Sequence, residues 1–130
     1  MKETAMDHII LHTDGAPKAI GPYAQAIKVG NTVYTSGQLG IDPQTGALPD
    51  GIEAQAHNAM RNIGAILNAA GLTYENIVKT TIFLQDLGHF GEVNHVYETY
   101  FSGAYPARSC VQVAALPKGG LVEIECVAVA

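Results

Sequence analysis

Two charged residues of opposite sign, Arg108 and Glu123, stand in apolar, strand-like parts of the sequence. A guanidinium group can hold a carboxylate through two hydrogen bonds, and a carboxylate can orient or deprotonate a water molecule. We therefore expect Arg108 to anchor the carboxylate of a small molecule and Glu123 to act beside it. Their spacing leaves a second interpretation open, in which the two side chains simply neutralise one another across neighbouring strands.

The alternation of residues along the predicted strands indicates which side chains share a face, because residues two apart point the same way. In the last strand, apolar residues alternate with Glu123 and Glu125, and in the strand before it Val111 and Val113 alternate with more polar residues. One apolar face is therefore expected to lie beneath helices. The second, semi-polar face is expected to carry Arg108, Cys110, Gln112, Glu123 and Glu125, with Tyr34, Ser36 and Gln38 from nearer the N-terminus.

The elements that position these residues follow from apolar periodicity and from turn residues. Apolar residues three or four apart predict a helix from Ile52 to Ala70, which Gly71 ends. A second helix is expected to follow Asp86 as its cap and to end before Gly103. The last two strands are expected to pair with one another across Pro117–Gly120. The predicted strands are His8–Thr13, Ala26–Val29, Thr32–Gly37, Ile77–Leu84, Ser109–Ala114 and Leu121–Val129.

This order of elements predicts an α+β fold in a single domain over residues 1–130. The two helices are expected to cover one face of a mixed sheet of about six strands. The second face carries apolar residues such as Tyr34 and Val127, which are unlike an open protein surface. We therefore expect a further copy of the chain to cover that face.

Composition narrows the classes of function. The chain has 130 residues, of which 48% are hydrophobic and 15% charged, as is typical of one compact domain. A net charge of −5, with no run of Lys or Arg, argues against nucleic acid as a partner. The opening Met1–Asp7 has no apolar stretch of signal-peptide length, and no segment reaches membrane-spanning length. We expect a cytoplasmic protein that binds no membrane.

The histidines and cysteines do not have metal-ligand spacing. His8 and His12 lie about 13 Å apart along an extended strand, which is too far for one ion. His89 and His95 point to different sides of the second predicted helix. Two cysteines are too few for a disulfide framework, and each lies in an apolar run where a free cysteine packs well. We expect no metal ion and no disulfide.

Several motifs, in order over nearly the whole chain, resemble those of the RidA (YjgF) family. The block Pro106-Ala107-Arg108-Ser109 is the most specific of them. The chain departs from the resemblance at Leu39-Gly40, where many members have isoleucine and proline, and at the short Ser102–Ala104 loop. The matching motifs are Gly21-Pro22-Tyr23, Ser36-Gly37-Gln38, Val78–Leu87, Asn94, Tyr105–Val111 and Glu123-Ile124-Glu125.

The resemblance implies a fold and an activity. It implies a chorismate-mutase-like subunit in a homotrimer with a barrel-like core, with sites in the clefts between subunits. It also implies an enamine/imine deaminase that hydrolyses 2-aminoacrylate, 2-iminopropanoate and 2-iminobutanoate to 2-oxo acids and ammonia. Such an enzyme would remove reactive metabolites, and the resemblance implies no cofactor and no metal.

The resemblance also assigns catalytic roles to the two charged residues. Arg108 would hold the substrate carboxylate, and Glu123 would position and activate the water that attacks the imine carbon. Because an imine carbon is already electrophilic, orientation and a general base suffice without a covalent nucleophile.

Five further residues are expected at the substrate site. Tyr23 would close the pocket, Ser36 and Gly37 would orient the ligand or let it approach the backbone, and Cys110 would line the pocket. Asn94 would contact the substrate from the second helix. A purely structural role stays open for each of them. Tyr23 could be a packed tyrosine, Ser36 and Gly37 could be only the end of a strand, the Cys110 thiol could be packed, and the Asn94 amide could cap a loop. Gln38 is expected at the rim, with ordinary exposure.

A non-catalytic trimer is the alternative function, since relatives have been linked to ligand sensing, translation inhibition and chaperone-like behaviour. A sensor of carboxylates needs Arg108 but not a water-activating acid, so the presence of Glu123 favours the enzyme. A ribonuclease is a weaker interpretation, because the acidic chain lacks a basic groove.

Overall fold

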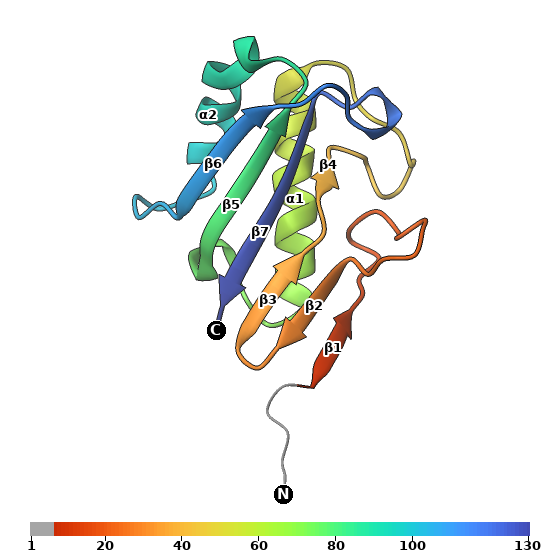
Figure 1. Cartoon of the computed structure of the whole chain (residues 1–130), viewed down its shortest axis with the longest axis vertical. Coiled ribbons are helices and arrows are strands. Elements are labelled where there is room, and N and C mark those ends of the chain that lie inside the picture. Colours follow the sequence, from red (N-terminus) through yellow and green to blue (C-terminus); the bar gives the residue numbers. More distant parts are fainter. Residues whose placement is uncertain (1–6) are drawn as a thin grey trace, which may run out of the picture.

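The computed structural model describes residues 7–130, so most of the opening Met1–Asp7 segment lies outside the described residues. One sheet runs through the whole domain, with two helices beside it (Figure 1). The helices are α1 (Ile52–Ala69) and α2 (Phe90–Glu98). The strands are β1 (His8–Leu11), β2 (Ala26–Val29), β3 (Thr32–Thr35), β4 (Gln38–Leu39), β5 (Ile77–Leu84), β6 (Ala107–Gln112) and β7 (Val122–Val129).

The sheet is mixed, as predicted, and its strand order is β1-β2-β3-β7-β5-β6, with β4 also paired to β7. The pairing of β5 with β6 is parallel, because α2 carries the chain back across the sheet between them. All other pairings are antiparallel. The predicted pairing of the last two strands is wrong, since β5 lies between β6 and β7.

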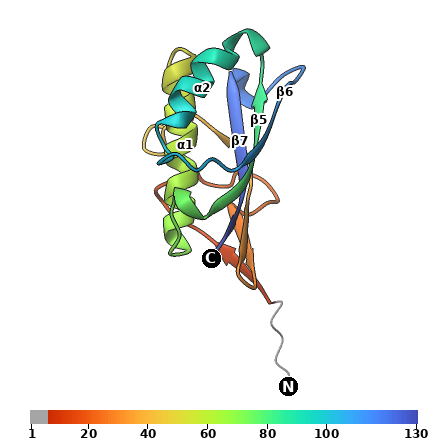
Figure 2. The same ribbon diagram turned by 90° about the vertical axis from the view of Figure 1, so that its left-hand side faces the viewer.

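Both helices cover the same face of the sheet, as predicted, and the opposite face is uncovered in this chain (Figure 2). The α1 residues Met60, Ile63 and Leu67 are at most 1% exposed, which confirms the apolar stripe expected of that helix. Removing such side chains from water is the main force that holds a helix on a sheet.

Local signals placed most boundaries correctly. Gly71, with φ of 75°, follows the end of α1 as expected. The Gly30-Asn31 turn, with Gly30 at φ 59°, joins β2 to β3. Asp86 does not cap α2 directly: its carboxylate accepts a hydrogen bond from the Gly88 amide at 2.8 Å in a short 3₁₀ turn that precedes the helix.

The predicted alternation is right for β7 and wrong for β6. In β7 every second residue, namely Val122, Ile124, Cys126 and Ala128, is at most 3% exposed beneath the helices, and Glu123 and Glu125 face the other way. In β6, Arg108 and Cys110 stand opposite Thr80 and Ile82, which are both buried on the helix side. The side chains expected on the open face, namely those of Arg108, Cys110 and Gln112, therefore lie on the helix-covered face.

Neither helix of the described part of the chain is long and apolar enough to cross a membrane.

Candidate functional site

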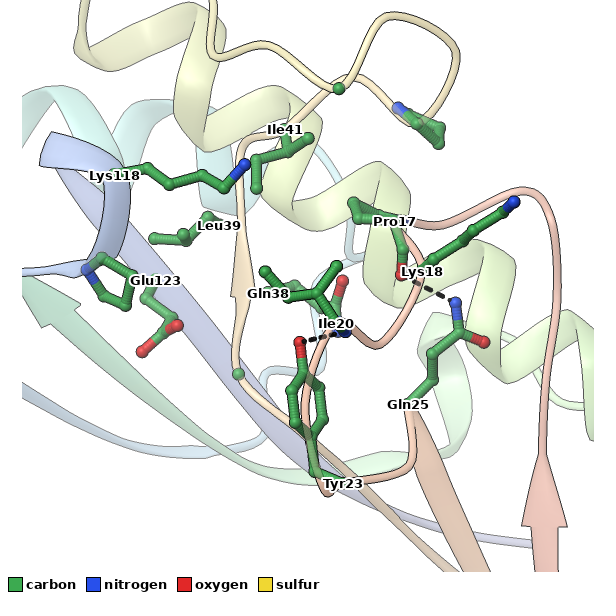
Figure 3. Close-up of a pocket in the computed structure, with 14 residues that line it drawn as sticks. Pro17, Lys18, Ile20, Tyr23, Gln25, Gln38, Leu39, Ile41, Lys118 and Glu123 are labelled. Carbon is green, nitrogen blue, oxygen red and sulfur yellow. Dashed lines mark hydrogen bonds between the residues drawn. The ribbon is translucent and has the colours of Figure 1, made fainter.

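A cavity of about 340 Å³ opens between the 17–25 loop, β4 and the start of β7 (Figure 3). Three residues expected at the site, Tyr23, Gly37 and Glu123, lie in its wall. The wall is largely apolar, which suits a small organic molecule held by a few polar groups. The other lining residues are Pro17, Lys18, Ile20, Gln25, Gln38, Leu39, Ile41, Pro43, Gly46, Pro117 and Lys118.

Glu123 is the acidic group of this cavity. Its side chain is partly buried, and none of the residues from 7 to 130 forms a hydrogen bond or ion pair with its carboxylate. Burial, and secondarily the Glu125 carboxylate, raise the pKa of Glu123 above its ordinary value. A carboxylate with a raised pKa and no neutralising partner is a suitable general base for a water molecule.

Gly37 sets the position of that carboxylate. A Cβ on Gly37 would lie 2.7 Å from Cδ of Glu123 and 3.0 Å from its Cγ. Atoms this close would clash, so any other residue at position 37 would displace the Glu123 side chain.

The loop that carries Tyr23 is held by Gln25, which sequence reasoning missed. The Gln25 side chain is 2% exposed; its Nε2 donates to Pro17 O at 2.8 Å and its Oε1 accepts from Thr13 N at 2.8 Å. Tyr23 is half exposed, and its hydroxyl accepts from the Ile20 amide at 3.4 Å. An amide next to the apolar start of β2 was the only signal for Gln25 in the sequence.

Two lysines, Lys18 and Lys118, also line the cavity and were missed. Within residues 7–130, Lys118 is the one non-glycine residue with positive φ, at 59°. A β-carbon makes that conformation unfavourable, so the turn that precedes β7 has a defined and strained shape. The residues Pro117–Gly120 predicted a turn in the chain. They did not predict that this turn would lie beside the cavity.

Ser36 does not line the cavity. Its Oγ donates to Ala24 O at 2.6 Å, and its amide donates to Gln25 O at 2.9 Å. The hydroxyl thus ties the end of β3 to the 17–25 loop. Gln38 is 5% exposed, so the expectation of ordinary exposure for it is wrong.

Arg108 lies in a different place, against α2. Its Nη1 donates to Oδ1 of Asn94 at 2.7 Å, and its Cζ lies 5.3 Å and 5.1 Å from the ring centres of Phe90 and Tyr97. A second cavity, of about 370 Å³, opens here and is lined by Asn94, Tyr97, Glu98, Tyr105, Pro106 and Arg108. The Asn94 amide therefore binds the Arg108 guanidinium and does not cap a neighbouring loop.

Arg108 and Glu123 do not meet within one chain. Arg108 on β6 stands opposite Thr80 of β5, and Glu123 on β7 stands opposite Phe83 of β5. The two residues therefore lie on the two strands that flank β5, and their side chains point to opposite faces of the sheet. They are about 10 Å apart along β5 and about 10 Å apart across it, from the spacings of residues and strands. The expected shared face and the alternative of a cross-strand ion pair are therefore both wrong.

Cys110 lines neither cavity in the described chain. It is partly buried, and that burial raises the pKa of its thiol. A protonated thiol is a poor nucleophile, which agrees with a mechanism that does not use it.

No group of three or more His, Cys, Asp or Glu in residues 7–130 is arranged to hold a metal ion. His57 instead hydrogen-bonds through Nδ1 with the Tyr100 hydroxyl at 2.8 Å. That contact joins α1 to the segment after α2.

Comparison with known proteins gives relatives that match nearly the whole chain. A family model described as Endoribonuclease L-PSP matches residues 13–130. The 2-iminobutanoate/2-iminopropanoate deaminase of Mus musculus is 53% identical over 121 residues, covering 92% of this chain and 90% of that protein. The crystal structure of RidA from the Antarctic bacterium Psychrobacter sp. PAMC 21119 has a TM-score of 0.92 and 52% identity, covering 94% of this chain and 99% of that one. The crystal structure of E. coli TdcF with bound serine has a TM-score of 0.92 and 46% identity, covering 94% and 98%.

Proposed function

The chain belongs to the RidA (YjgF) family, and from this premise we propose that it is an enamine/imine deaminase. Its substrates are 2-iminobutanoate and 2-iminopropanoate, together with the enamine tautomer 2-aminoacrylate. Its products are the corresponding 2-oxo acids and ammonia.

The observation that carries the proposal is a pair of opposite charges that are both left without a counter-charge. Within residues 7–130, Arg108 has no acidic partner and Glu123 has no basic one. A buried or partly buried charge is costly unless something compensates it. A substrate with a carboxylate for Arg108 and a reacting water for Glu123 supplies both partners.

The reaction then needs only these groups. Arg108 holds the carboxylate of the imine by two hydrogen bonds. Glu123 takes a proton from a water molecule, and the water oxygen attacks C2 while the imine nitrogen takes up a proton. The resulting carbinolamine loses its C–N bond as its nitrogen takes up the hydroxyl proton, so that ammonia leaves and the 2-oxo acid forms. One water molecule is consumed for each ammonia released.

The two groups can act on one small molecule only if they come from different copies of the chain. Their place on opposite faces of the sheet supports sites between subunits. The uncovered face is also too apolar for an open surface, with Tyr34 51% and Val111 42% exposed. A homotrimer with its sites between neighbouring subunits accounts for both observations.

The other residues expected to contact the substrate are part of the same proposal. Tyr23 and Gly37 bound the substrate beside Glu123, and Asn94 and Cys110 belong to the Arg108 side. Ser36 acts through the loop that it ties down. The free cysteines fit the reducing cytoplasm, where we place the protein.

A trapping assay tests the activity. A threonine dehydratase releases 2-iminobutanoate from threonine, and semicarbazide captures whatever imine remains free. The purified chain is expected to lower semicarbazone formation and to speed the release of 2-oxobutanoate, and the Arg108→Ala and Glu123→Gln variants are expected to do neither. If the wild-type chain bound 2-oxobutanoate without accelerating imine loss, it would be a binding protein and not a deaminase.

A further inference from the structure

Helix α2 presents a stripe of three side chains to β6. Phe90, Asn94 and Tyr97 are spaced four and three residues apart, which places them on one face of the helix over two turns. All three contact the Arg108 side chain, two through their ring faces and one through its amide oxygen.

The guanidinium lies over both rings. The Arg108 Cζ is 5.3 Å from the Phe90 ring centre and 5.1 Å from that of Tyr97, so the two rings contact it at nearly the same distance. Ring faces attract a cation through their quadrupole, most strongly where water is excluded.

In the described part of the chain, the contacts of the Arg108 guanidinium include no counter-charge, although the side chain is partly buried. No carboxylate within residues 7–130 lies within salt-bridge distance of Arg108. Two aromatic rings and an amide orient the guanidinium without neutralising its charge. The full positive charge is therefore kept for an incoming anion.

Tyr97 is itself fixed by a second contact. Its hydroxyl lies 2.8 Å from Oγ1 of Thr80, and both residues are buried, at 5% and 1% exposure. Burial raises the pKa of Tyr97, so the phenol stays protonated and keeps this hydrogen bond over the physiological pH range. Thr80 is also the residue of β5 that stands directly opposite Arg108 on β6.

We propose that Thr80 and Tyr97 form a positioning pair that pre-orients Arg108 for the substrate carboxylate. Thr80, on a strand that is paired on both sides, fixes the Tyr97 ring, and that ring with Phe90 fixes the guanidinium. Both residues act through the guanidinium: Thr80 does not line the second cavity, and the hydroxyl of Tyr97, which does line it, is engaged by Thr80. An arginine side chain has many rotamers, so an anchor that is already ordered loses less freedom when the carboxylate binds. This inference rests on the proposed function, which makes Arg108 the anchor.

The test compares two ligands that differ only in charge. Titration calorimetry on the purified chain measures the dissociation constants of 2-oxobutanoate and of its neutral amide, 2-oxobutanamide. The wild-type chain is expected to prefer the carboxylate. In Tyr97→Leu, the dissociation constant of 2-oxobutanoate is expected to rise roughly tenfold, the scale of a lost cation–π contact, with that of the amide unchanged.

Thr80→Val tests the second half of the pair and keeps the ring in place. It is expected to weaken 2-oxobutanoate binding by a smaller factor, again without effect on the amide. Tyr100→Phe is the matched control, because it removes a tyrosine hydroxyl that contacts His57 and not Arg108, from a partly buried residue. It is expected to leave both constants unchanged.

The outcomes separate this inference from the function on which it rests. If both variants kept the wild-type preference for the carboxylate, or lost affinity for acid and amide equally, the positioning role would be wrong and the deaminase would stand. If the wild-type chain showed no preference for the acid, Arg108 would not be a carboxylate anchor, and both proposals would fall.

Discussion

Arg108 and Glu123 point to opposite faces of the sheet from strands on either side of β5. A site that uses both must therefore join two copies of the chain, and this predicts complementation. Arg108→Ala and Glu123→Gln are each expected to be inactive. When they are unfolded together in equal amounts and refolded, about a quarter of wild-type activity is expected, since a quarter of randomly assembled sites pair two intact residues.

The same mixture without unfolding and subunit exchange serves as the control and should stay inactive. A mixture of refolded chains that never regained activity would show that both residues act within one subunit, against the geometry of the sheet.

Gly37 and Glu123 give a second prediction. The Cβ of Gly37→Ala would press on the Glu123 carboxyl group at 2.7 Å, and the flexible side chain can yield where backbone could not. We expect activity to fall roughly ten- to hundredfold, the scale of a misplaced catalytic group. Stability should change by no more than about 1 kcal/mol. Kinetics and urea unfolding measure the two effects.

Gly91→Ala is the matched control for this change. Its Cβ would meet no atom within 4 Å on the surface of α2, so activity should be unaffected. Equal losses in both variants would contradict the role given to Gly37.

The raised pKa of Glu123 predicts where activity is lost at acid pH. Only the carboxylate form can accept a proton, so activity is expected to be lost as the pH falls through a value above that of an ordinary glutamate. Glu125→Gln removes the smaller cause of the shift and leaves burial in place. The acid limb of its kcat/KM profile should move to lower pH without reaching the ordinary glutamate range. An unmoved limb would mean that another group limits the rate.

The raised pKa of Glu123 also predicts that its charge destabilises the folded chain, whereas a carboxylate in a salt bridge would stabilise it. Its pKa is higher in the folded chain than in the unfolded chain, so its charge opposes folding at neutral pH. Glu123→Gln is expected to raise the melting temperature at pH 7. The gain should shrink as the pH falls through the folded pKa and vanish below the unfolded one. A lower melting temperature at pH 7 would show that the carboxylate makes a favourable contact.

The buried Thr80–Tyr97 hydrogen bond should appear in a double-mutant cycle. Thr80→Val and Tyr97→Phe are each expected to cost about 1–3 kcal/mol, because each leaves a buried hydroxyl unpaired. The double variant should cost less than the sum, since it removes both polar groups. Urea unfolding of the four proteins gives the coupling, and additive costs would indicate that the hydroxyls do not interact.

Much of the fold and part of the site could be predicted from local patterns. The apolar stripe of α1, the alternation in β7 and the turn at Gly30 each depend on residues close together in the sequence. These features are fixed by helical and strand periodicity and by backbone conformations that glycine favours. The charged pair and its motif were also visible there, as were Tyr23 and Gly37.

The tertiary structure alone decided how Arg108 and Glu123 relate. The small and mixed residues of β6 show no clear alternation of apolar and polar side chains. Which of them face the helices therefore depends on α2 crossing above the strand, and which strand β6 pairs with depends on β5 entering between β6 and β7. Such pairings are made between distant segments when the sheet assembles, and periodicity within a strand does not encode them. The sequence by itself therefore pointed to the two groups to which we assign the chemistry, and the order of the strands decided that one chain keeps them apart.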